Sequence, residues 1–112
     1  MAPPLEPGPL EEAFRRGIDL FNHQEFWESH EAWEEVWNAT AGEGRLFYQG
    51  LIQAAASMVH RQKGNTQGMR TLAGRALEKL ERFGQGEGGI DLGSFIDDFR
   101  NAVEGGDWPK IQ

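Results

Sequence analysis

The chain of 112 residues contains no cysteine. This absence excludes a disulfide framework, thiolate metal sites and cysteine nucleophiles, and it favours a reducing compartment. The glycine-rich phosphate loops G-x-x-x-x-G-K and G-x-G-x-x-G and the G-x-S-x-G turn are also missing, which excludes nucleotide binding or serine chemistry through those motifs. Any catalytic or metal-binding chemistry must therefore come from oxygen and imidazole groups.

Basic residues are scarce, because eleven Lys and Arg stand against eighteen Asp and Glu, for a formal net charge of −7. A surface of this average charge repels phosphate backbones and anionic headgroups, so we expect no nucleic-acid partner and no membrane partner. No stretch approaches the roughly 20 apolar residues that span a bilayer, and the N-terminus lacks the basic and apolar regions of a signal peptide. We therefore expect a soluble, cytoplasmic protein.

Proline is nearly absent beyond the start of the chain, since four of the five prolines lie within the first nine residues. Proline fixes φ and removes a backbone donor, so we predict an extended arm over residues 1–9. Residues 10–112 are predicted to form a single helical-bundle domain, whose length is enough to bury somewhat more than about 60% of the surface that the unfolded chain exposes.

No segment alternates apolar and polar residues as a half-buried strand does, whereas apolar residues recur at three- or four-residue spacing along most of the chain. This pattern predicts an all-α fold, a compact bundle of four to five antiparallel helices. The predicted helices cover about residues 10–22, 24–41, 43–63, 66–83 and 92–103. The segment GQGEGG, residues 84–89, is predicted to be a mobile surface loop because glycine favours flexible backbone.

Aromatic residues gather in the segment EFWESHEAWEEVW, residues 25–37. On a helical wheel, His30 and Glu34 lie in the middle of an aromatic arc of roughly 120°. The aromatic members of this arc are Phe26, Trp27, Trp33 and Trp37. A carboxylate and an imidazole among indoles must find polar partners, because an unpaired buried polar group is costly. His30 and Glu34 are four residues apart, so the simplest interpretation is that they pair across one helical turn in the core.

A polar stripe along the predicted third helix offers these residues further partners. Its members are Gln49, Gln53, Ser57 and His60. No charged residue lies between Arg45 and Arg61, whereas an exposed face of this length usually carries several. If the second helix packs on the stripe, a semi-buried polar cluster forms; a solvated stripe is the alternative. The cluster would consist of His30, Glu31, Glu34, Gln49, Gln53, His60, Trp33 and Trp37.

One hypothesis makes this cluster a metal site. The string HEAWE resembles H-E-x-x-H with Glu34 in place of the second histidine, and a His/Glu pair at this spacing can hold one ion. A divalent metal would then be bound by His30, Glu34 and His60, with Glu31 or Glu34 activating a water in hydrolase-like chemistry. The motif is weak, and the Glu-x-x-His pairs of di-iron bundles are excluded because residue 27 is tryptophan.

Two segments, FNHQEFWESHEAWEEVW and FYQGLIQAAASMVHRQKGN, resemble the family catalogued as domain of unknown function 309. The resemblance covers about residues 18–80. The residues that carry it are His30-Glu31 with Trp37, Gln49-Gly50-Leu51-Ile52-Gln53, His60 and Gly64-Asn65. It implies a small all-helical bundle found in soluble proteins, and no assigned reaction. Met69 departs from the family pattern, which usually has a small residue at that position.

Three functions from different classes stay open. We favour a binding or interaction module that forms a homo-oligomer such as a dimer, because tryptophan is enriched at interfaces and four tryptophans occur in this short chain. The alternatives are a metal-dependent enzyme at His30, Glu34 and His60, and a small-molecule pocket lined by tryptophan and glutamine. The residues identify no substrate and no cofactor beyond the divalent metal of that hypothesis.

Overall fold

The computed structural model describes residues 8–112, and its regular structure there is entirely helical, which confirms the predicted all-α bundle. The elements are α1 (Pro9–Asn22), α2 (Phe26–Ala39), α3 (Gly44–Gln62), α4 (Thr66–Leu80), the 3₁₀ helix η1 (Glu87–Gly89) and α5 (Leu92–Val103). The predicted helix ends differ from these by three residues or fewer. Within the described range, none of the helices has the length and apolar content that a membrane span requires.

The first helix begins at Pro9, one residue earlier than predicted. Proline suits the first helical position because its missing N–H would have no intrahelical partner and its φ is already helical. Glu11 and Glu12 follow in the first turn, where acidic side chains complement the helix dipole. Of the predicted arm over residues 1–9, residues 1–7 lie outside the described residues, and Gly8 is the N-cap of α1.

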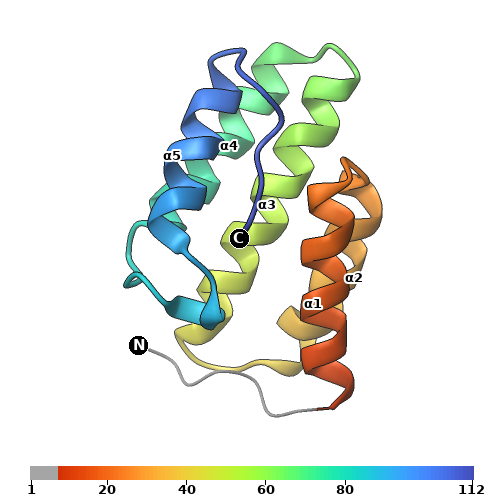
Figure 1. Ribbon diagram of the computed structural model, residues 1–112, viewed down its shortest axis with the longest axis vertical. Helices are drawn as coiled ribbons and strands as arrows, with labels where there is room; N and C mark the ends of the chain where they lie inside the picture. The colour runs from red at the N-terminus through yellow and green to blue at the C-terminus, as the bar shows by residue number, and fades with distance from the viewer. Residues whose placement is uncertain (1–7) are drawn as a thin grey trace.

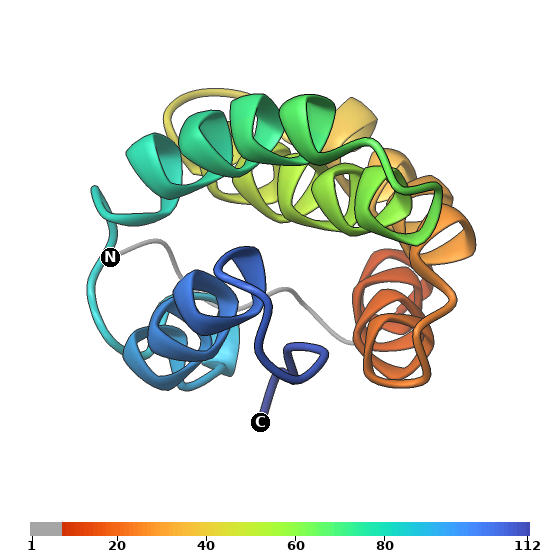
Figure 2. The same cartoon turned by 90° about the horizontal axis from the view of Figure 1, so that it is seen from above.

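Consecutive helices of the first four pack against each other as antiparallel neighbours (Figure 1). Seen from above, α3 and α4 lie side by side across one side of the molecule, and α1 and α5 lie on the other (Figure 2). The C-terminal segment runs between α1 and α5. The radius of gyration is 12.8 Å, close to the roughly 13 Å expected for a compact chain of about 100 residues.

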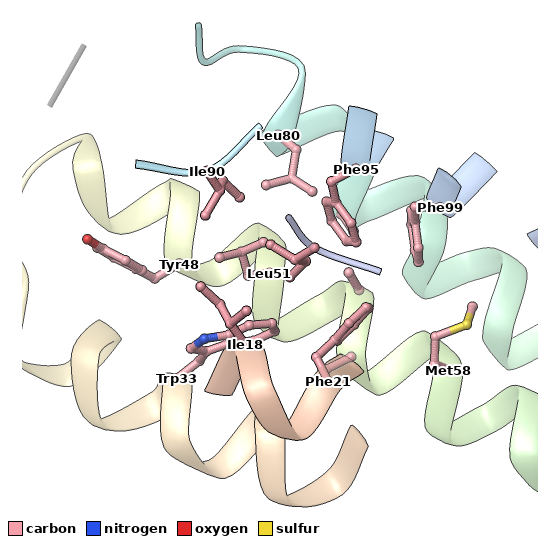
Figure 3. Close-up of a cluster of buried hydrophobic side chains, with 14 of the residues drawn as sticks. Ile18, Phe21, Trp33, Tyr48, Leu51, Met58, Leu80, Ile90, Phe95 and Phe99 are labelled. Carbon is pink, nitrogen blue, oxygen red and sulfur yellow. The ribbon is translucent and has the colours of Figure 1, made fainter. Parts of the chain in front are cut away.

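Buried side chains from all five α-helices form one core (Figure 3). Phe21 of α1 packs against aromatic rings of two other helices. Its ring centroid is 4.9 Å from that of Phe26 in α2 and 5.5 Å from that of Phe95 in α5, both in the edge-to-face arrangement that aromatic pairs prefer. One phenylalanine therefore connects the first helical hairpin with the last helix.

Trp33 is fully buried where α1 and α2 meet. Its Nε1–H donates to the Phe14 carbonyl oxygen at 3.1 Å, so the indole is satisfied within the core. Gly17 lies directly against the indole, and a Cβ at residue 17 would be 2.2 Å from Trp33 Nε1. Ser29 Oγ also donates to the Gly17 carbonyl at 2.8 Å. The two helices can approach this closely only because residue 17 has no side chain.

Gly64 and Asn65 form the turn between α3 and α4. Gly64 has a φ of 75°, the left-handed conformation that glycine adopts without strain after a helix. Asn65 is the N-cap of α4, and its Oδ1 accepts from the Gly68 N–H at 3.0 Å. The short connection makes α3 and α4 an antiparallel hairpin.

The glycine-rich segment 84–89 is only in part the exposed loop that its composition predicts. It contains η1, and the Glu87 side chain is 2% exposed. A Cβ at Gly88 would lie 2.7 Å from the Phe47 ring, so this glycine lets the backbone approach the core. Gln85 Oε1 accepts from the Gly93 N–H at 2.8 Å, which ties the segment to α5. The surface-loop prediction therefore holds for residues 84–86 and 89, and it is wrong for Glu87 and Gly88, where glycine permits close packing.

The segment after α5 returns across the molecule to the end of α1. Asn22 Nδ2 donates to the Ile111 carbonyl oxygen and Asn22 Oδ1 accepts from the Ile111 N–H, each at 2.8 Å. The Ile111 side chain is buried, and the Trp108 ring packs on Phe26 with a centroid separation of 5.5 Å. This segment therefore covers the core between α1 and α5.

Candidate functional site

Helix α2 divides the predicted aromatic arc into two flanks. The buried flank contains Phe26 and Trp33, and the neighbouring residues Ser29 and Val36, which lie outside the predicted arc, are buried with them. The partly exposed flank consists of Trp27, His30, Glu34 and Trp37. Trp27 is the most exposed of these aromatic rings, at 56%. The polar residues that the sequence placed among indoles therefore lie at the edge of the core.

A cleft of about 180 Å³ lies between the partly exposed flank of α2 and one face of α3. Its lining residues are Glu34, Trp37, Gln49, Ile52 and Gln53. Four of these belong to the predicted polar cluster, and they come from both helices. The polar stripe of α3 thus meets α2 at Gln49 and Gln53.

Two residues that line the cleft have buried polar atoms without a partner among the described residues. These atoms are Trp37 Nε1 and Gln53 Oε1. Most buried polar groups in proteins are hydrogen-bonded, and each exception costs about 1–3 kcal/mol. The indole nitrogen is only a donor, whereas rotation of the glutamine amide presents either an acceptor or a donor. A partner of the indole must therefore carry an acceptor, and a partner of the amide oxygen must carry a donor.

His30 lies beside the cleft and contacts Glu34. The distance from His30 Nδ1 to Glu34 Oε1 is 3.3 Å, within ion-pair range, yet the same nitrogen is buried and makes no hydrogen bond of acceptable geometry with the described residues. We take the pair as an electrostatic contact, because a hydrogen bond requires the angle as well as the distance. Trp27 stacks on the imidazole, with centroids 5.1 Å apart and planes 19° apart. The pairing of His30 with Glu34 is therefore present but does not satisfy the histidine.

Sequence reasoning missed Arg45, which holds the Trp37 indole in place. The Arg45 guanidinium lies 3.7 Å from the centroid of the Trp37 ring, a cation–π contact, and its Nε donates to the Trp37 carbonyl oxygen at 3.2 Å. The two residues face each other across the α2–α3 turn, so helical periodicity contains no signal for this contact. Ile52 was also missed, although its position between Gln49 and Gln53 indicates the same region of α3.

Three of the predicted cluster residues lie elsewhere. Glu31 is exposed on α2 and does not line the cleft. Trp33 belongs to the core, where its N–H is bonded to Phe14. His60 lies near the end of α3, with its Nδ1 3.0 Å from Asn65 Nδ2, so it contributes to the turn into α4. The predicted convergence is therefore limited to Glu34, Trp37 and the two glutamines, with His30 adjacent.

The predicted metal site lacks a sufficient set of ligands. In residues 8–112, no group of three His, Asp or Glu side chains is placed to hold a metal ion together. His30 and Glu34 lie together, but His60 is directed to Asn65 and Gly68 instead. Glutamine amides, which complete the lining of the cleft, are poor ligands for transition metals.

A profile of the family described as Domain of unknown function (DUF309) matches residues 14–72. This match covers 59 of the 112 residues, more than half of the chain. The chain belongs to this family. The DUF309 match extends from within α1 to the first half of α4 and includes every residue that lines the cleft. No curated protein matches the chain, and the family description states no activity, so the function must be argued from the site itself.

Proposed function

We propose that this DUF309 protein is a binding protein whose cleft between α2 and α3 takes a small, neutral or cationic polar molecule. The observation that carries the proposal is the pair of buried polar atoms, Trp37 Nε1 and Gln53 Oε1, that have no partner among the described residues. A ligand that accepts a hydrogen bond from the indole and donates one to the amide oxygen would recover about 1–3 kcal/mol at each group. Binding would therefore supply the hydrogen-bond partners that these two buried atoms lack.

The cleft indicates the size and chemistry of the ligand. Its volume of about 180 Å³ is slightly larger than the cavities of about 150 Å³ that accept one benzene ring. Trp37 and Ile52 supply apolar contact area for such a ring. A primary amide fits the polar groups, because its carbonyl oxygen can accept from Trp37 and its NH₂ group can donate to Gln53. Glu34 disfavours an anion, so the ligand class is a planar aromatic amide.

Benzamide is a direct probe of this proposal, and benzoate is its anionic control of nearly the same shape. A nitrogen–proton NMR titration follows the indole N–H signals of the individual tryptophans. We expect benzamide to shift the Trp37 indole signal saturably, with a dissociation constant on the order of 1 mM, equivalent to about −4 kcal/mol. The Trp33 indole signal should stay in place because its N–H is already bonded to Phe14. Benzoate should produce no saturable shift.

The variant Gln53→Met tests the amide directly, since methionine keeps the unbranched shape and removes both polar atoms. It should weaken benzamide binding about tenfold, as expected for the loss of roughly 1.4 kcal/mol. The control is Gln67→Met, a change of the same kind at an exposed position on α4. Equal shifts with benzoate, or equal binding by Gln53→Met and the wild type, would show that the cleft is not the site proposed.

The predicted homo-oligomer and the predicted cytoplasmic location stay predictions. Trp27 favours contact with a second copy, because it is a large apolar side chain that is 56% exposed. The neighbouring carboxylates of Glu28 and Glu31 are also exposed, and two copies meeting at this face would bring like charges together. Any self-association through Trp27 should therefore increase with salt, which sedimentation of the wild type and Trp27→Ala measures.

A further inference from the structure

A second cavity, of about 250 Å³, lies where the end of α3, the first half of α4 and the end of α5 meet. Its charged and hydroxyl-bearing lining residues are Arg61, Thr66, Arg70 and Glu104. None of its lining residues belongs to the cleft between α2 and α3. It is therefore a separate site with a different charge.

Arg61 is held in a fixed orientation at this cavity. Its guanidinium carbon lies 4.0 Å from the centroid of the Trp108 ring, and its Nη2 donates to the Gly106 carbonyl oxygen at 2.9 Å. The other terminal nitrogen, Nη1, is buried and has no partner among the described residues. None of the ion pairs among the described residues involves Arg61. Because arginine stays protonated, its positive charge is uncompensated.

Arg70 adds a second guanidinium to the same cavity. Its Nη2 is 3.9 Å from Glu104 Oε2, too far for a hydrogen bond, and both side chains are more than half exposed. An exposed pair at this distance contributes little free energy, so Arg70 can exchange Glu104 for another anion. Two guanidinium groups thus face one carboxylate at the cavity.

The helix dipoles do not alter this balance. The cavity includes Thr66, at the positive N-terminal end of α4, and Val103, at the negative C-terminal end of α5. These two ends oppose each other, and each acts only over about one turn. The excess positive charge therefore comes from the two arginines, in a protein whose net charge is −7.

We propose that this cavity binds a small molecule through a carboxylate or phosphate group held by Arg61 and Arg70. A planar guanidinium donates two parallel hydrogen bonds to such a group, and Arg61 has one buried nitrogen still in need of an acceptor. Met69, Ala102 and Val103 line the cavity as well and provide apolar surface for the carbon part of the molecule. The site is independent of the cleft and requires no ligand there.

The test is an NMR titration with inorganic phosphate and with acetate at constant ionic strength, read on the backbone amides of Thr66, Met69 and Gly105. At least one probe should shift these signals saturably. The probe that binds more tightly identifies phosphate or carboxylate as the preferred group. Arg61→Gln should weaken binding at least about tenfold, in line with the roughly 1.5–3 kcal/mol of a charged hydrogen bond. Arg61→Lys should also weaken it, because lysine keeps the charge without the planar fork.

Two further variants at exposed positions should change the affinity for the anion in opposite directions. Arg70→Gln should weaken anion binding, whereas Glu104→Gln should strengthen it because it removes the competing carboxylate. Arg75→Gln, an exposed position on α4 that does not line the cavity, is the control for net charge and should leave binding unchanged. If Arg61→Gln fails to fold, the Arg70 and Glu104 variants still decide the matter. Absence of saturable shifts, or equal weakening by Arg75→Gln, would overturn the proposal.

Discussion

At the scale of single residues, Gly17 sets the distance between α1 and α2. The absence of a side chain lets the Trp33 indole lie against the α1 backbone, where it bonds to the Phe14 carbonyl. Gly74 on α4 offers the opposite environment, because a Cβ there would meet no atom within 4 Å. These two helical glycines form a matched pair for testing the packing.

Gly17→Ala should lower the free energy of unfolding by about 1–3 kcal/mol, because the new methyl group overlaps the Trp33 ring and forces the helices apart. Gly74→Ala should raise it by about 0.5–1 kcal/mol, through the better helix propensity of alanine alone. Urea denaturation followed by circular dichroism measures both. A Gly17→Ala protein as stable as the wild type would show that α1 does not pack on Trp33 as described.

The environment of Tyr48 determines how the free energy of unfolding should change with pH in the alkaline range. Burial, and secondarily the charge of the nearby Glu87 carboxylate, raises the pKa of its hydroxyl above the ordinary value of 10.0. The folded state then holds this proton more tightly than the unfolded state does. The stabilisation is fully present below pH 10.0 and is lost as pH rises through the folded-state pKa.

Tyr48 is the only tyrosine, so the absorbance of tyrosinate follows its ionisation without interference from another phenol. We expect a midpoint above 10.0 in the folded protein. We also expect Tyr48→Phe to lose less unfolding free energy than the wild type between pH 9 and about 11, the interval in which an unfolded tyrosine ionises. Identical losses in the two proteins would contradict the buried environment described for Tyr48.

The candidate site shows what residue patterns can and cannot predict. Glu34, Gln49 and Gln53 were identifiable because uncharged polar residues on a central helix and a carboxylate among indoles are unusual. Arg45 was not identifiable, since its contact with Trp37 depends on the geometry of the turn between two helices. Glu87 was missed because its burial depends on how a glycine-rich segment packs on the core.

At the scale of the helices, periodicity predicted the number and type of elements well. The arc on α2 was predicted less well, because a helical wheel gives the angles of side chains but does not state which neighbour occupies each angle. Trp33 and Trp37 share the arc, yet α1 covers Trp33 whereas α3, through Arg45, contacts Trp37. The predicted aromatic face of α2 is therefore shared between two neighbouring helices, α1 and α3.

The cap at the start of α4 gives a prediction at this scale. Asn65→Ala should lower the free energy of unfolding by about 1 kcal/mol, because the Gly68 N–H loses its acceptor. Asn65→Asp keeps a side-chain oxygen at the same position and should retain most of the stability. Thermal denaturation of the two variants measures the difference. Equal loss in both would mean that the side-chain oxygen does not cap the helix.

At the scale of the whole molecule, the segment that follows α5 packs back onto the end of α1. Asn22 and Ile111 are 89 residues apart and bond to each other twice. No local pattern predicts a contact at this separation, since neither helical period nor turn chemistry extends so far. The closure of the core between α1 and α5 therefore became visible only in the structure.

Asn22→Ala should lower the free energy of unfolding by about 1–3 kcal/mol, because it leaves the Ile111 N–H and carbonyl without their partners. Hydrogen exchange at the Ile111 amide should accelerate at the same time. Asn38→Ala, an exposed position on α2, serves as the control and should change neither quantity. An unchanged exchange rate at Ile111 in the Asn22 variant would contradict this closure.

The most direct measurement of the binding proposal is the free energy of unfolding of the wild type and Gln53→Met, each with and without benzamide. Without benzamide, Gln53→Met should be at least as stable as the wild type, because it removes a buried amide oxygen that lacks a partner. With benzamide at about ten times the wild-type dissociation constant, the wild type should gain roughly 1.4 kcal/mol, and Gln53→Met, which binds about tenfold more weakly, only about 0.4 kcal/mol. The opposite result, a loss of about 1–3 kcal/mol in Gln53→Met and no gain from benzamide in either protein, would make Gln53 part of a structural network and the cleft no binding site.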